Sequence, residues 1–89
     1  MNNYTATMIR WRLNAVMAEY FIGTSELANE LEKLPQHISN LKNRTDVPRL
    51  NGRQLANICN ALNRILIKKN HQPSITISDL IDYQFDGTT

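Results

Sequence analysis

The sequence predicts an all-α fold, a compact bundle of about five helices. Apolar residues recur at helical spacing in several segments, and the chain has only three glycines and three prolines. Its 89 residues suffice for one modest core. We therefore expect a single domain over residues 1–89, with the core at about 6–83 and a loose tail at 84–89.

The first two helices are predicted over residues 6–20 and from Thr24 to Leu31 or Lys33. Gly23 is an acceptable N-cap for the second helix, and Glu26 complements its dipole. Trp11 lies off the apolar stripe of the first helix. That stripe comprises Ile9, Leu13, Val16, Met17 and Tyr20.

The third helix is predicted over residues 35–42. Pro35 suits its first turn, because the missing N–H has no helical partner there. Ile38 and Leu41 face inward. The outward positions carry amides, a histidine and a serine instead of the usual charges: Gln36, His37, Ser39, Asn40 and Asn43.

Two capping boxes open the last two helices. Asn51 with Gln54 begins a fourth helix, whose stripe is Leu55, Ile58, Cys59, Leu62 and further Ile65 and Leu66. This helix ends either at Asn63 or at Lys68; a short strand at 64–67 pairing with 74–77 is a further alternative. Thr76 with Asp79 begins a short helix that carries Leu80, Ile81 and Tyr83.

The net charge of +2 is small, but the charges are segregated along the chain. The stretch between residues 42 and 69 is basic and is opposed only by Asp46. Such a stretch indicates a phosphate-facing surface or, alternatively, a solvated charged face. Its members are Lys42, Arg44, Arg49, Arg53, Arg64, Lys68 and Lys69.

Several function classes have no support in the sequence. No catalytic arrangement and no glycine-rich phosphate loop is present, so we expect neither an enzyme nor a cofactor. His37, Cys59 and His71 lack the spacing of metal ligands, and one cysteine excludes an internal disulfide. No apolar run approaches the length of about 20 residues that spans a membrane, and residues 1–7 do not resemble a secretion signal. The expected location is the cytoplasm.

A very short turn joins the second and third predicted helices, and Ala28 is small enough to allow their close approach. This is the sequence shape of a helix-turn-helix. Gln36 and Asn40, four residues apart, share the outward face of the third helix. Amide side chains pair bidentately with adenine in the major groove, which makes these two the candidate base-reading residues.

The chain resembles the phage-repressor and Cro-type helix-turn-helix family (the XRE family). The pattern Leu27-Ala28, Ile38 and Leu41 has the family's spacing, and residues 35–41 resemble its recognition helix. Residues 55–62, 77–83 and 9–13 resemble the fourth, closing and opening helices. The resemblance implies a lambda-repressor-like bundle and a transcriptional regulator, repressor-like, that binds double-stranded DNA as a homodimer.

The resemblance also implies roles for individual residues. Gln36, His37 and Asn40 would face bases. The remaining candidates would contact phosphates or lie beside the DNA backbone: Thr24, Ser39, Lys42, Asn43, Arg44, Arg49 and Arg53.

The turn departs from the family pattern, because Glu32, Lys33 and Leu34 stand where the family has a glycine, an apolar residue and a polar N-cap. A non-glycine residue in the left-handed conformation costs about 1–2 kcal/mol. We therefore expect a longer second helix, with Leu34 filling the core. The altered turn also leaves an alternative function open, a degenerate helix-turn-helix that acts as a protein-interaction module or an antitoxin-like partner-binding protein.

Overall fold

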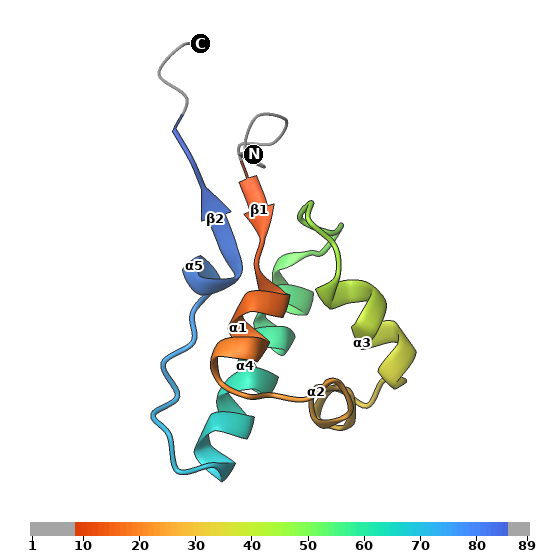
Figure 1. Cartoon of the computed structure of the whole chain (residues 1–89), viewed down its shortest axis with the longest axis vertical. Coiled ribbons are helices and arrows are strands. Elements are labelled where there is room, and N and C mark those ends of the chain that lie inside the picture. Colours follow the sequence, from red (N-terminus) through yellow and green to blue (C-terminus); the bar gives the residue numbers. More distant parts are fainter. Residues whose placement is uncertain (1–8, 86–89) are drawn as a thin grey trace.

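The computed structural model describes residues 9–85, which form five helices and a two-stranded antiparallel sheet (Figure 1). Helices dominate, but the prediction of an all-α fold is wrong in that two strands are present. The elements in chain order are β1 (Ile9–Trp11), α1 (Leu13–Glu19), α2 (Thr24–Leu31), α3 (Pro35–Lys42), α4 (Gly52–Lys68), α5 (Ile77–Leu80) and β2 (Ile81–Tyr83).

The longest helix, α4, runs along the middle of the molecule, and the other helices pack around it (Figure 1). The α2–α3 pair lies on one side, and the segment between α4 and α5 returns along the other. One cluster of buried side chains joins all five helices, including Leu13 of α1, Leu27 of α2, Ile38 of α3, Leu62 of α4 and Leu80 of α5.

The first predicted helix, 6–20, is wrong in its N-terminal part. Residues 9–11 form β1, and α1 begins only at Leu13; residues 6–8 lie outside the described part of the chain. The backbone is held extended by pairing with β2, in which Ile9 lies opposite Tyr83 and Trp11 opposite Ile81. The sequence between β1 and β2 is almost the whole domain, so local periodicity cannot reveal this pairing.

The last predicted helix is also too long. The Thr76 amide donates to Asp79 Oδ2 at 2.8 Å, as the capping box predicts, but α5 ends after one turn at Leu80. Ile81 and Tyr83, expected on that helix, belong to β2. Within the expected loose tail, residues 84 and 85 have no regular structure, and 86–89 lie outside the described residues.

The fourth helix follows one of the two expected lengths. Asn51 Oδ1 accepts from the Gln54 amide at 2.8 Å, and α4 continues to Lys68. Asn63 does not end the helix. Its side-chain amide instead exchanges two hydrogen bonds, both of 2.9 Å, with the backbone of Ile75 and so fixes the returning segment. No strand pairs 64–67 with 74–77 in the described structure.

Trp11 connects the sheet to α3. Its side chain is buried, although Trp11 lies off the apolar stripe predicted for the first helix, and its Nε1–H donates to the carbonyl of Leu41 at 3.0 Å. The Trp11 amide donates to the Thr45 carbonyl at 2.9 Å. The C-terminal end of α3 and the loop that follows are therefore held against β1.

Candidate nucleic-acid interface

The connection between α2 and α3 is a tight turn through Glu32. Glu32 adopts the left-handed conformation (φ 57°), and the Lys33 amide donates to the Ala28 carbonyl at 2.9 Å. The expected longer second helix is therefore wrong, since α2 ends at Leu31. Leu34 is 75% exposed and does not fill the core. The residues that the turn brings to the core are Leu31 and Ile38.

Replacing Glu32 with glycine should stabilise the protein. Glycine adopts a positive φ without steric cost, whereas the cost for Glu32 is about 1–2 kcal/mol, partly offset by the greater freedom of glycine in the unfolded chain. We expect a net gain of about 0.5–1 kcal/mol, measured by urea denaturation. Asn70, also at positive φ (64°), is the matched control. Asn70→Gly should gain less, because asparagine tolerates this region; a loss of stability in Glu32→Gly would contradict the turn geometry.

Helix α3 presents one face to solvent and anchors the other. Pro35 occupies its first turn as predicted, Ile38 is fully buried and Leu41 is half-buried. The three candidate base-reading residues, Gln36, His37 and Asn40, are all exposed. The structure therefore leaves these side chains accessible to a partner while holding the backbone beneath them.

Gln36 and Asn40 form a hydrogen-bonded pair on this face. Gln36 Nε2 donates to Asn40 Oδ1 at 3.0 Å. This bond orients the amide of Gln36, whose Oε1 and second N–H make no hydrogen bond among residues 9–85. One acceptor and one donor on a single oriented amide are what bidentate recognition of adenine requires.

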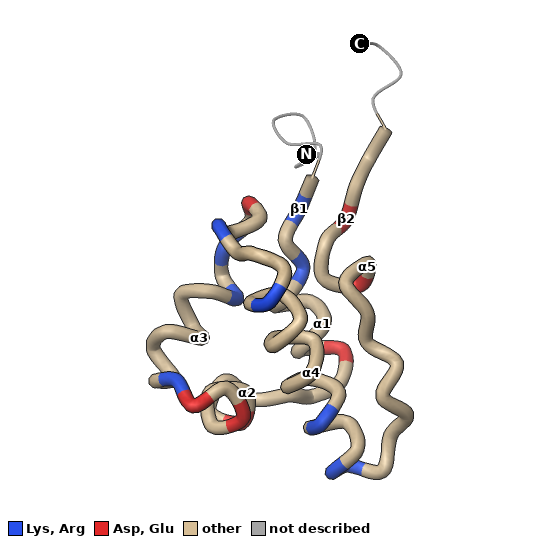
Figure 2. Tube along the Cα trace, turned by 180° about the vertical axis from the view of Figure 1, so that it is seen from behind, with Lys and Arg blue, Asp and Glu red and all other residues tan. Residues whose placement is uncertain are grey.

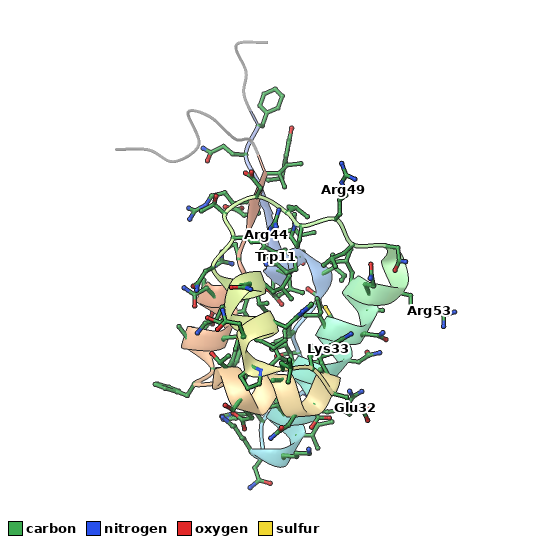
Figure 3. All side chains as sticks on the ribbon, turned by 90° about the vertical axis from the view of Figure 1, so that its right-hand side faces the viewer. Trp11, Glu32, Lys33, Arg44, Arg49 and Arg53 are labelled. Atoms are coloured by element: carbon green, nitrogen blue, oxygen red, sulfur yellow. The ribbon has the colours of Figure 1, made fainter. Side chains whose placement is uncertain are left out.

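Three arginines, Arg44, Arg49 and Arg53, form a basic rim beside the exposed face of α3. Figure 3 shows Arg49 and Arg53 extending away from the body of the protein, with Arg44 near the C-terminal end of α3. All three arginines are exposed, and none has an ion pair within residues 9–85. A shallow depression between α3 and the 43–51 loop is lined by His37, Asn40, Arg44 and Arg49, together with Leu41, Pro48 and Leu50.

The remaining candidate phosphate contacts are less uniformly placed. Asn43, directly after α3, is exposed beside Arg44, whereas Lys42 in the last turn is half-buried. Ser39 is half-buried on α3, and Thr24 is half-buried at the first turn of α2. His37, Asn40, Arg44 and Arg49 therefore form the continuous part of the surface.

The C-terminal part of the basic stretch has a different role. Arg64 Nε lies 2.7 Å from Glu30 Oε1, and Lys68 pairs with the other oxygen of the same carboxylate. Hydrogen bonds from Lys68 and Arg64 hold the pKa of Glu30 below its usual value. Lys69 lies 3.2 Å from Glu26. Figure 2 shows these basic residues at the end of α4, away from the cluster around the 43–51 loop. They link α4 to α2 and do not extend the basic rim.

Three polar residues of this region did not appear among the sequence candidates. Lys33, Gln54 and Asn57 line a small cleft between the α2–α3 turn and α4, and His37 lies at the same cleft. Figure 3 shows Lys33 beside α3, on the side that faces α4. Gln54 and Asn57 are three residues apart at the edge of the apolar stripe of α4, and this spacing is the signal that could have identified them.

Comparison of the chain with protein-family models, with curated proteins and with solved structures finds no significant match. Within the described residues, no helix is both long and apolar enough to cross a bilayer. Over the same range, no three histidine, cysteine or acidic side chains gather as they would around a metal ion. The case for a function therefore depends on the α3 face and its rim.

Proposed function

We propose that this protein binds double-stranded DNA in a sequence-specific manner and regulates transcription, acting as a repressor. Helices α2 and α3 would form the helix-turn-helix, with α3 in the major groove, as in the phage-repressor and Cro-type family that the sequence resembles. The protein would act by occupying a promoter site, without catalysis.

The oriented amide of Gln36 is the observation that carries this proposal. A surface that serves only for solubility gains nothing from a fixed amide, and its exposed helix positions are usually charged. In a groove, Gln36 would accept from adenine N6 and donate to N7, with Asn40 holding it in place. Ile38 anchors the helix beneath this pair and so limits the angle at which the amides are presented.

The basic rim supports the same proposal. Phosphate contacts provide most of the affinity of DNA-binding proteins and fix their register, while base contacts provide specificity. Arg44, Arg49 and Arg53 lie around α3 without acidic partners among residues 9–85. In the proposed complex they would contact the phosphates of a strand that borders the groove holding α3.

A homodimer would place two copies of α3 in successive major grooves. Half-sites about one helical turn apart, roughly 34 Å, would then be read by the same residues on each copy. Selection from a random duplex library tests the proposal directly. We expect an enriched palindrome for the wild type and none for the Gln36→Ala/Asn40→Ala double variant. No enrichment with the wild type would refute sequence-specific binding.

Gln36→Ala and Asn40→Ala should each weaken binding to the selected site by about 1–3 kcal/mol. Binding to random duplex should change little, because neither side chain is needed for phosphate contacts. Titration of both duplexes by fluorescence anisotropy measures the difference. Asn60→Ala, which removes an exposed amide beside the groove between α4 and Ile75, is the matched control and should change neither affinity. Equal losses on both duplexes would show that the α3 amides contact only the backbone.

The alternative is a protein-interaction module, including an antitoxin-like protein that binds a partner. One face of the β1–β2 ribbon favours it. By register this face carries Ile9, Trp11, Ile81 and Tyr83; Trp11 is buried, whereas Ile9 and Tyr83 at the outer end of the ribbon are exposed. If the protein fails to bind any duplex at low salt, the alternative replaces the DNA-binding proposal.

A further inference from the structure

An exposed leucine stands directly before α3. Leu34 is 75% exposed, although its backbone is well fixed (φ −76°, ψ 145°). Its carbonyl accepts from the amides of His37 and Ile38 at 3.0 and 3.3 Å, and the following Pro35 further restricts it. The side chain is thus uncovered, whereas the backbone that carries it is rigid.

Neither packing nor capping explains leucine at this position. N-cap positions favour serine, threonine, aspartate and asparagine, whose side chains accept from the first turn. Leu34 forms no such hydrogen bond. It also belongs to neither the buried core nor the apolar side chains packed against that core. An apolar side chain held in water at the exposed end of α3 is suited to contact an apolar group of a partner.

We infer that Leu34 contacts the C5-methyl group of a thymine and so determines part of the sequence preference. This inference rests on the proposed function. The thymine methyl is the apolar group that a base pair presents in the major groove, and every adenine read there by an amide is paired with a thymine. Leu34 lies two residues before Gln36, at the helix end whose residues contact base edges in helix-turn-helix proteins.

The geometry assigns complementary roles to two neighbouring residues. Gln36 supplies the polar contact to adenine, and Leu34 supplies the apolar contact to a thymine of the same A·T-containing half-site. Pro35, also exposed, keeps the two residues at a fixed separation. A guanine–cytosine pair offers no methyl at this point, so the contact discriminates against it.

Replacing single thymines by deoxyuridine tests the inference, because this change removes only the methyl group. The DNA used is the site selected with the wild-type protein. At one thymine position of the half-site, deoxyuridine should weaken wild-type binding by about four-fold for each half-site substituted. This is the effect of losing one buried methyl carbon. Leu34→Ala should bind the thymine site several-fold more weakly and should be insensitive to deoxyuridine at that position.

Ile67→Ala is the matched control, since Ile67 is an exposed apolar residue near the far end of α4. It should retain the wild-type sensitivity to deoxyuridine. If the wild type binds its site specifically but tolerates every deoxyuridine, the Leu34 inference is refuted and the proposed function stands. Leu34→Ala with unchanged sensitivity also refutes it. Failure to select any site overturns both.

Discussion

Replacing Ile38 with alanine is expected to lower the free energy of unfolding by about 2–5 kcal/mol. Ile38 is the buried residue of α3, and its side chain lies in the cluster that joins all five helices. The substitution removes buried carbons and leaves a cavity that the surrounding helices fill only in part. For a domain of this size, the melting temperature should fall by roughly 10 °C or more.

Circular dichroism measures this effect, and Gln36→Ala serves as the control on the opposite face of α3. Because Gln36 is exposed, its replacement should leave the melting temperature nearly unchanged. An Ile38→Ala protein as stable as the wild type would show that α3 is not anchored through this side chain. The position of the candidate base-reading residues would then have no structural basis.

Binding to duplex DNA is expected to weaken steeply with salt. About five phosphate contacts give a slope of log affinity against log salt concentration near −4 to −5. Between 50 and 200 mM salt, the affinity should therefore fall by about 250- to 1,000-fold. Anisotropy titrations over this range measure the slope, and a flat dependence would contradict an interface based on phosphates.

The two groups of basic residues provide matched variants for the same measurement. Arg49→Gln and Arg53→Gln should each reduce the magnitude of the slope by about 1 per bound protomer, because each removes one phosphate contact from each copy. Arg64→Gln removes the same charge from a residue that pairs with Glu30 on another part of the surface. Its slope should remain that of the wild type. Equal effects of all three variants would indicate a general electrostatic attraction instead of a defined rim.

Local signals in the sequence predicted the central part of the fold. The apolar stripes, the proline of α3 and the capping box of α4 predicted the start of α2, both bounds of α3 and the start of α4. The sheet was missed because each strand has only three residues, too few for a periodic pattern. The sequence does not predict the turn, because Glu32 adopts a positive φ that costs a non-glycine residue about 1–2 kcal/mol, and α2 ends at Leu31 all the same.

Local helical spacing also predicted part of the candidate site. The outward face of α3 follows from helical spacing, and the structure exposes Gln36, His37 and Asn40. The division of the basic stretch could not be predicted, because Glu30 meets Arg64 and Lys68 only when α2 packs against α4. The exposure of Leu34 could not be predicted either, because its apolar side chain favours burial and only the tight turn through Glu32 directs it to solvent.

The pairing of β1 with β2 also has a consequence for how the chain folds. It joins the two ends of the described sequence, so closing it carries a larger loop-closure entropy than the neighbouring contact between α2 and α3. Contacts between distant segments slow folding, whereas local helix pairs can form early. During synthesis, β1 cannot pair until β2 has left the ribosome. The strand β1 fixes the end of α3 through Trp11, so the final ordering of the α3 face depends on residues 81–83, which are synthesised after all five helices.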